Sequence, residues 1–219
     1  MNVRKDNWYK NFRNNYSLFY MSRRIESTRK FMKKFMKIEN LNSGHIIIDL
    51  GARQGSFNKI FRELNFEKII AVDIDAKALA KNDANEKYIM DLEEKLPFPD
   101  GFCECVFMAE VIEHFEHRVE LLKEIFRILK PFGYLVLTTP NKRSLIAFFD
   151  KFIGRFIENG KWNGHDFNHR YVYAFDEIRD LLRKVGLKII TIESFYLFYG
   201  LPIRTKTSLG MCTWVLARK

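Results

Sequence analysis

The fold is decided by residues 45–55, which read His45-Ile46-Ile47-Ile48-Asp49-Leu50-Gly51-Ala52-Arg53-Gln54-Gly55. The first six residues are a short apolar run rich in β-branched side chains, which is typical of a strand covered on both faces of a parallel sheet. Two glycines then indicate a turn, and residues 57–64 carry apolar side chains at the spacing of one helix face. The stretch therefore predicts a strand, a glycine turn and a helix in succession.

The same alternation continues along the chain. Six further strands are predicted, at Lys68–Asp73, Tyr88–Asp91, Cys103–Ala109, Tyr134–Thr138, Leu187–Ser194 and Met211–Ala217. Helical patterns separate most of them, and an aromatic loop lies between the last two. Strands that alternate with helices imply right-handed crossovers, so the predicted fold class is α/β, a doubly wound and mostly parallel sheet of seven strands. Cys103 and Cys105 fall on one face of their strand and are expected to be buried, inert thiols.

Charge and composition add a second region to this domain. Of the 219 residues, the first 40 hold eleven Lys/Arg against three Asp/Glu, so they carry +8 of the net charge of +10. We therefore divide the chain into a basic helical arm at 1–42 and a domain at 43–219, with a lid or insertion at about 142–174. The arm either covers the sheet or contacts an anionic membrane surface. Without an apolar run of about 20 residues or a signal peptide, a cytoplasmic protein is expected.

Acidic residues end three of the predicted strands, at Asp49, Asp73 and Asp91. Ligands of doubly wound sheets bind beyond the carboxyl ends of the strands, where glycines let them approach the backbone. A carboxylate at Asp73 suits the two hydroxyls of a ribose. However, Arg53 replaces the second glycine of the dinucleotide fingerprint, and three carboxylates would repel a pyrophosphate. The pattern favours an adenosine-type ligand with a cationic end over NAD.

At this point the chain resembles the class I S-adenosylmethionine-dependent methyltransferases, nearest to their small-molecule branch (methyltransferase domain 11-like). The resemblance covers roughly residues 43–217 and rests on Asp49–Gly55, Ala71–Asp75, Met90–Leu92, Leu96–Gly101, Ala109–Phe115 and Ile128–Leu135. It implies a Rossmann-like methyltransferase fold with S-adenosylmethionine as the cofactor. It also implies methyl transfer to a small-molecule acceptor, for which we expect an oxygen atom on a sugar, a lipid-linked glycan or a quinone-like ring.

The resemblance implies a cofactor site at the strand ends. Its expected residues are Asp49, Gly51, Arg53, Gly55, Asp73, Ile74, Asp91, Leu92 and Glu110. In this site Asp73 holds the ribose, Ile74 packs against the adenine and Asp91 meets the adenine amine. Arg53 departs from the family's middle glycine, and it either crowds the amino-acid end of the cofactor or pairs with its carboxylate. We favour the pairing, because every acidic anchor is kept.

Three histidines are candidates for a general base. His114 follows the fourth strand, beside the position that the resemblance implies for the methyl group. His165 and His169 lie in a Gly-His…Tyr…Leu stretch that is similar to one recurring in this branch. A histidine with a pKa near neutrality suits the deprotonation of a hydroxyl. Helix capping at His114 and a solvated loop at the other two are the alternatives. No fourth ligand accompanies His165, Asp166 and His169, so no metal site is expected.

Two other functions remain as alternatives. The basic pI of about 9.5 suggests a nucleic-acid methyltransferase. Enzymes that methylate base amines usually carry Asn/Asp-Pro-Pro-aromatic after the fourth strand, to hold a flipped base. This chain has Ala109-Glu110-Val111-Ile112 there, so a nucleic-acid partner is not expected. The second alternative is a non-catalytic S-adenosylmethionine-binding protein, which Arg53 suggests and which fold alone does not exclude.

Overall fold

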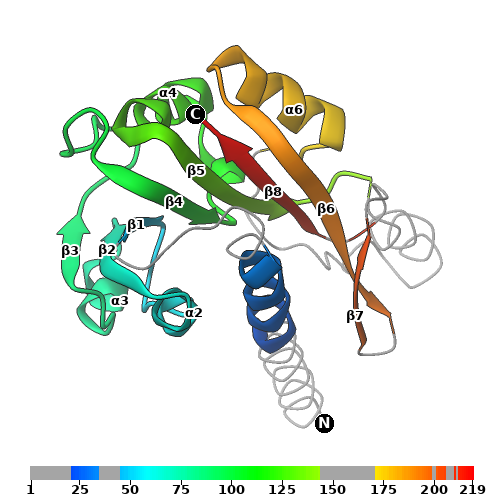
Figure 1. Ribbon diagram of the computed structural model, residues 1–219, viewed down its shortest axis with the longest axis horizontal. Coiled ribbons are helices and arrows are strands. Elements are labelled where there is room, and N and C mark those ends of the chain that lie inside the picture. The colour runs from blue at the N-terminus through cyan, green and yellow to red at the C-terminus, as the bar shows by residue number, and fades with distance from the viewer. Residues whose placement is uncertain (1–20, 35–44, 144–170, 199–200, 206–209, 211) are drawn as a thin grey trace, which may run out of the picture. The chain divides into compact units, whose positions relative to one another are not determined.

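The computed structural model describes residues 21–34, 45–143, 171–198, 201–205, 210 and 212–219 (Figure 1). The chain divides into two compact units, Met1–Leu41 and Asn42–Lys219. In the first unit residues 21–34 form a helix, in which Glu26 pairs with Arg29 at 2.9 Å and with Lys30 at 3.7 Å. None of the described helices is both long and apolar enough to cross a membrane. Most of the predicted insertion at 142–174 lies outside the described residues.

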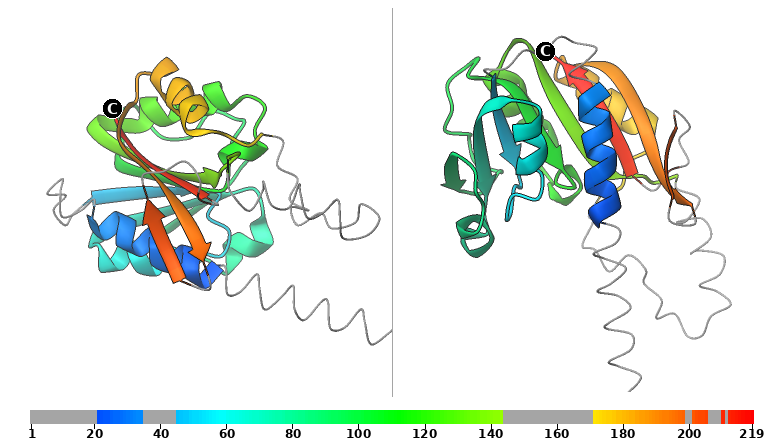
Figure 2. Two further views of the ribbon diagram at one scale, coloured as in Figure 1. Left: turned by 90° about the vertical axis from the view of Figure 1, so that its right-hand side faces the viewer. Right: turned by 60° about the horizontal axis from the view of Figure 1, so that its bottom comes forward.

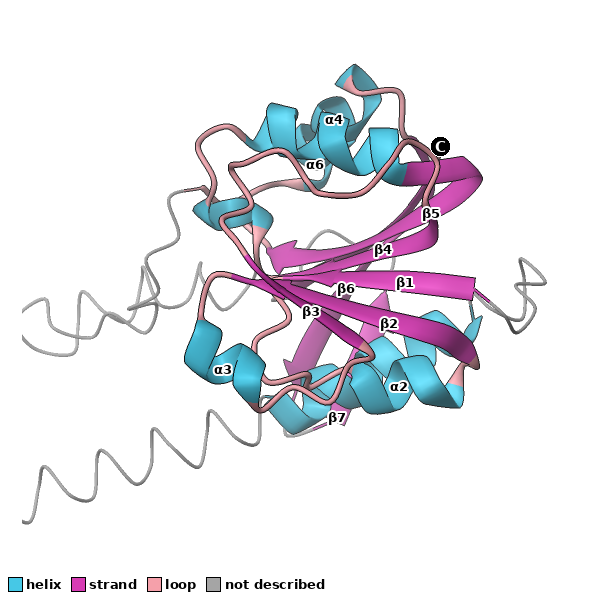
Figure 3. Cartoon of the chain, turned by 90° about the vertical axis from the view of Figure 1, so that its left-hand side faces the viewer, coloured by secondary structure: helices cyan, strands magenta, loops and turns pink. Residues whose placement is uncertain are grey.

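The second unit is one sheet with helices on both faces. Its elements, in chain order, are β1 (His45–Leu50), α2 (Asn58–Glu63), β2 (Phe66–Asp73), α3 (Ala76–Ala80), β3 (Glu86–Ile89), β4 (Cys103–Ala109), η1 (Ile112–His114), α4 (Arg118–Ile128), β5 (Leu129–Pro140), α6 (Phe175–Lys184), β6 (Lys188–Phe198), β7 (Leu201–Thr205) and β8 (Cys212–Arg218). Helices α4 and α6 lie against one face of the sheet, and α2 and α3 lie against the other (Figure 3).

The order of the strands is β3-β2-β1-β4-β5-β8-β6-β7. β1 pairs in parallel with both β2 and β4, so the chain builds the sheet outward from β1 in one direction and then in the other. The gap between β1 and β4 is therefore the switch point of a doubly wound fold, where ligands bind. β8 is antiparallel to both of its neighbours, β5 and β6. The predicted fold class is confirmed, and the sheet is mixed.

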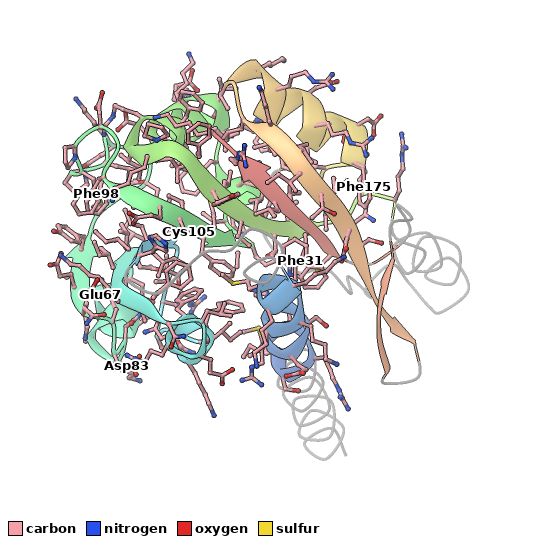
Figure 4. All side chains as sticks on the ribbon, viewed as in Figure 1. Phe31, Glu67, Asp83, Phe98, Cys105 and Phe175 are labelled. Atoms are coloured by element: carbon pink, nitrogen blue, oxygen red, sulfur yellow. The ribbon has the colours of Figure 1, made fainter. Side chains whose placement is uncertain are left out.

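Burial explains why the local patterns fold in this way. Ile47, Ile48 and Leu50 of β1 are fully buried, because helices cover both faces of this central strand. Cys103 and Cys105 are also fully buried within β4, and Figure 4 shows Cys105 among the packed side chains of the sheet. Burial raises the pKa of Cys103 to about 12 and the pKa of Cys105 well above its ordinary value. Their expected inertness follows, since the thiolate is the reactive form.

Within the described part of the chain the sheet has eight strands, one more than predicted. The aromatic loop expected after Ser194 is instead the continuation of β6 to Phe198, followed by β7, which pairs antiparallel with β6 (Figure 2). The expectation of a loop was wrong because aromatic residues also favour strands when a pairing partner is available. The partner strand, β7, lies beside β6 only after the chain has folded back, so the local sequence pattern does not reveal this pairing.

Candidate functional site

Residues that follow four parallel strands meet at one edge of the sheet. The register pairs Leu50 of β1 with Val72 of β2 and with Met108 of β4, and it pairs Asp73 with Ile89 of β3. Figure 3 shows that the loops after these strands gather at the same edge. The structure therefore brings together the turn after β1, the acidic end of β2 and the loops after β3 and β4. The strand ends predicted to hold the cofactor lie within this group.

The glycine turn after β1 packs tightly between its neighbours. Asp49 is only 2% exposed, and the N–H groups of Gly51 and Ala52 both donate to the carbonyl oxygen of Val72, at 2.8 and 3.1 Å. Gly51 has φ +76°, and a Cβ at this position would lie 2.3 Å from Cγ2 of Val111. A side chain is excluded at Gly51 by both its backbone conformation and its contact with the loop after β4.

Two asparagines hold the other end of this turn. Asn82 donates to the carbonyl oxygen of Arg53 at 3.0 Å, and its Oδ1 accepts from Nδ2 of Asn58 at 2.7 Å. A Cβ at Gly55, which has φ +80°, would come within 2.5 Å of Asn58 Nδ2. Both asparagines are buried. Nothing in the sequence marks them as site residues, because an asparagine beside a helix end is an ordinary capping residue.

Arg53 keeps the backbone conformation of the glycine that it replaces. Its φ is +44°, in the left-handed region that side chains disfavour. Its N–H donates to Oδ2 of Asp73 at 2.8 Å, and its carbonyl oxygen accepts from Asn82, so hydrogen bonds hold it there. The side chain is exposed, and no described residue pairs with its guanidinium group. The guanidinium group is therefore available to a ligand at this edge.

Asp73 has acceptor capacity left for a ligand. The carboxylate is 7% exposed and accepts backbone N–H groups from Arg53 and Asp75, both at 2.8 Å. An ionised carboxylate has about four lone-pair sites, so roughly two remain for ribose hydroxyls. Asp73 thus also connects the turn after β1 with the turn after β2.

The expected adenine side lies next to Asp73. Ile74 is 66% exposed, so a flat aromatic base could cover an apolar side chain there. The N–H of Met90 donates to the Asp73 carbonyl oxygen at 3.1 Å, which brings the exposed Asp91 close by. Asp91 Oδ1 accepts the N–H of Glu93 at 3.0 Å. Leu92, in contrast, packs in the hydrophobic core, so its side chain is turned away from this edge.

The residue after β4 is strained. Glu110 has φ +57°, which costs an L-residue on the order of 1 kcal/mol. Two contacts with Thr138 of β5 hold it: its N–H donates to the Thr138 carbonyl oxygen at 2.9 Å, and its Oε1 accepts from Thr138 Oγ1 at 3.2 Å. Backbone strain of this kind tends to occur at functional sites. It fixes the direction in which the Glu110 side chain leaves the strand end.

Of the three candidate histidines, the structure describes only His114, while His165 and His169 lie outside the described residues. His114 ends the short helix η1 just after β4 and is exposed. Its neighbour Glu113 is fully buried and accepts from Oγ1 of Thr139 at 3.2 Å. Within the described part of the chain, no cluster of three or more His, Cys, Asp or Glu side chains is arranged to hold a metal ion.

These residues fit S-adenosylmethionine. Its cationic amino-acid end suits an edge with buried carboxylates, its ribose suits the remaining acceptor sites of Asp73, and its adenine suits the exposed Ile74. The absence of a side chain at Gly51 and Gly55 keeps the turn tight. Bound there, the cofactor would supply a methyl group already activated for transfer.

Comparisons with known proteins identify the family of the chain. The methyltransferase domain family matches residues 20–192. A malonyl-[acyl-carrier protein] O-methyltransferase of Marinomonas sp. is 27% identical over 169 residues, which are 74% of this chain and 60% of that protein. A ubiquinone/menaquinone biosynthesis C-methyltransferase of Pseudomonas savastanoi pv. phaseolicola is 24% identical over 181 residues, 75% of this chain and 70% of that protein. The chain thus spans less than two thirds of the first of these relatives.

Solved structures share the fold. A methyltransferase of Thermotoga maritima, described as a possible histamine N-methyltransferase, has a TM-score of 0.68 at 17% identity and covers 96% of this chain and 98% of its own. An S-adenosylmethionine-dependent methyltransferase of Archaeoglobus fulgidus has a TM-score of 0.66 at 19% identity, covering 93% and 99%. Because the family match extends over most of the sequence, the chain belongs to the methyltransferase domain family and is a class I S-adenosylmethionine-dependent methyltransferase.

Proposed function

We propose that this methyltransferase acts on an oxygen atom of a small molecule, such as a hydroxyl of a glycan, a lipid-linked compound or a quinone-like ring. The observation that carries the proposal is the end of β4, where the strained Glu110 and the buried Glu113 replace the proline-rich motif that holds a flipped base. A chain of phosphates would pass Glu110 and Asp91 at this edge and be repelled. A single small acceptor avoids most of that repulsion.

The curated relatives support a small acceptor. One is named for the O-methylation of malonyl-[acyl-carrier protein], and the other for C-methylation in quinone biosynthesis. Neither name refers to nucleic acid, which remains the less favoured alternative for this chain.

The chain's own residues would act mainly by alignment. Asp73 and Ile74 would hold the nucleoside, while the turn at Gly51 and the side chain of Arg53 would hold the amino-acid end. Holding two reactants in line is a large part of catalysis when one of them is already activated. A base is needed only where the acceptor hydroxyl must lose its proton early, and His114 is the described histidine best placed for that role.

Methyl transfer from radiolabelled S-adenosylmethionine to a panel of acceptors tests the function. The panel should contain a hydroxyquinone, a polyprenyl-linked glycan, a malonyl-loaded carrier protein and tRNA. We expect label in a small hydroxyl-bearing compound, with mass spectrometry locating it on oxygen. Label in tRNA alone would refute the proposal.

The role of His114 is tested with that acceptor. If His114 is the base, His114→Ala should lower turnover about 10²–10⁴-fold and leave cofactor affinity unchanged. His117→Ala is a matched control, because His117 is also exposed and lies only three residues further on. Equal, mild losses in both variants would mean that alignment alone carries catalysis.

We also propose that the basic arm at 1–42 contacts an anionic membrane, where a lipid-linked acceptor would be found. Its support is the net charge of +8 over residues 1–40. Binding to phosphatidylglycerol vesicles should fall steeply with salt and should weaken when residues 1–22, which carry +3 of this charge, are deleted. Binding that does not change with salt would contradict it.

A further inference from the structure

Arg118 differs in its surroundings from those arginines of the second unit that pair with carboxylates. Ion pairs with carboxylates are made by several of the others, namely Arg62–Asp83, Arg127–Glu124, Arg143–Asp176 and Arg183–Asp180. The Arg118 guanidinium instead lies over the ring of Tyr171, 4.1 Å from its centroid, and 5.9 Å from the ring of Tyr173. Its only hydrogen bond to a described residue is a long one, 3.4 Å, to the carbonyl oxygen of Glu116. No carboxylate among the described residues pairs with it.

This cluster lies at the edge of the sheet that holds the cofactor site. Arg118 begins α4, directly after η1 and the end of β4. The N–H of Tyr171 donates to the carbonyl oxygen of Glu113 at 3.1 Å, and the carbonyl oxygen of Tyr173 accepts from the N–H of Lys142 at 3.1 Å. Backbone hydrogen bonds therefore hold both tyrosines beside the ends of β4 and β5.

Tyr173 adds a polar atom that lacks a partner. Its side chain is 7% exposed, and its hydroxyl has no hydrogen-bond partner among the described residues. A buried polar group of this kind is uncommon, and a bound ligand is one of the few explanations for it. Burial raises the pKa of Tyr173 to about 12, so the hydroxyl keeps its proton and can donate it in a hydrogen bond.

We infer that Arg118, Tyr171 and Tyr173 form a subsite for an anionic group of the acceptor, a carboxylate or a phosphate. The inference rests on the proposed function, since it takes the acceptor to bind at this edge. A guanidinium stacked on an aromatic ring has a fixed plane and keeps its N–H fork open, which matches the oxygens of both anions. A ligand with one acidic group would contact this guanidinium group, whereas a polyanion would also come close to the carboxylates along the edge and be repelled by them. The acceptor is thus a small molecule that carries a hydroxyl and an acidic group.

The subsite is tested by direct binding, without methyl transfer. Malonate and methyl phosphate serve as probes for the two anions, titrated by calorimetry into the full chain saturated with S-adenosylhomocysteine. We expect at least one probe to bind, with Arg118→Gln weakening it about tenfold or more. Arg118→Lys should give an intermediate loss, because it keeps the charge and removes the fork. Arg179→Gln on α6 is the matched control, because Arg179 is exposed and its replacement changes the charge by the same amount. This variant should bind the probes like the wild type.

Tyr173→Phe supplies a second variant. It should weaken the probe about threefold or more, while the thermal midpoint without the probe does not fall, because the lost hydroxyl had no partner. Equal binding of both probes to the wild type and Arg118→Gln, or no binding to the wild type, overturns the inference. Loss of S-adenosylhomocysteine affinity in Arg118→Gln and Arg118→Lys alike would assign the arginine a structural role and overturn it too. Failure of the proposed function would appear differently, as probe binding that persists while no oxygen is methylated.

Discussion

The replacement of Asp73 by alanine should weaken cofactor binding and also loosen the turn that forms the site. Two ribose hydroxyls would donate to this carboxylate, and a hydrogen bond to a charged group contributes about 1.5–3 kcal/mol. Since both bonds share one acceptor group, we expect the equivalent of one, a loss of at least about tenfold in affinity for S-adenosylhomocysteine. Isothermal titration calorimetry at neutral pH measures it.

The structure adds a second effect, on stability. Asp73 also accepts the N–H groups of Arg53 and Asp75, each at 2.8 Å. Leaving both without a partner should lower the free energy of unfolding by about 2–4 kcal/mol. For a domain of this size that is a fall of about 5–10 °C in the thermal midpoint. Affinity is therefore compared at a temperature where the circular dichroism of the variant shows it to be folded.

A matched variant and a matched ligand separate the two effects. Asp75→Ala removes an exposed carboxylate two residues away, with its hydrogen bonds to the N–H groups of Lys77 and Ala78, so it should cost about 1 kcal/mol of stability and leave affinity unchanged. The 2′-deoxy analogue of S-adenosylhomocysteine lacks one of the two ribose donors, so Asp73→Ala should weaken it less than the parent ligand. An equal loss for both ligands would show that Asp73 acts only through the turn, and unchanged affinity in a folded variant would refute the site.

Three further predictions follow from particular contacts. If the guanidinium pairs with the ligand carboxylate, Arg53→Gly should weaken the binding of S-adenosylhomocysteine about fivefold or more and leave the binding of decarboxylated S-adenosylmethionine unchanged. Calorimetry measures both affinities, and tighter binding of S-adenosylhomocysteine would instead support crowding. Hydrogen bonds from Arg127 lower the pKa of Glu124 below its ordinary 4.5, so this carboxylate stabilises the fold above that pH and stops doing so as the pH falls through its folded pKa. Between about pH 7 and pH 3, urea unfolding should therefore show a larger fall in the free energy of unfolding for the wild type than for Arg127→Met. The difference should be about 1 kcal/mol or less, because the pair is partly solvated. Equal falls in the two proteins would contradict the pairing. Cys103 and Cys105 should resist alkylation in the native protein at about pH 8 and react in guanidinium chloride, and mass spectrometry that finds them modified in the native state would contradict their burial.

The local features of the site were accessible from the sequence, because each depends on neighbours along the chain. The apolar run before Asp49 requires a strand covered on both faces, and it is β1. Once the strands alternate with helices, the parallel arrangement places Asp73 and Asp91 at the same edge as the turn at Gly51. The hydrophobic pattern and the alternation of strands with helices were enough for these predictions, because both can be read from neighbouring residues along the chain.

Contacts between distant segments could be found only in the folded chain. The hydrogen-bonded residues Asn58 and Asn82 are 24 positions apart in the sequence. Strand β7 pairs along the free side of β6, which forms only when the chain folds back. The position of the Arg118 guanidinium over Tyr171 joins the start of α4 to a segment 53 residues further on, through a backbone hydrogen bond to Glu113. No periodic pattern marks such residues, because a side chain that packs across the fold is selected by the shape and polarity of its partner, and that partner comes close only when the sheet and its helices have assembled.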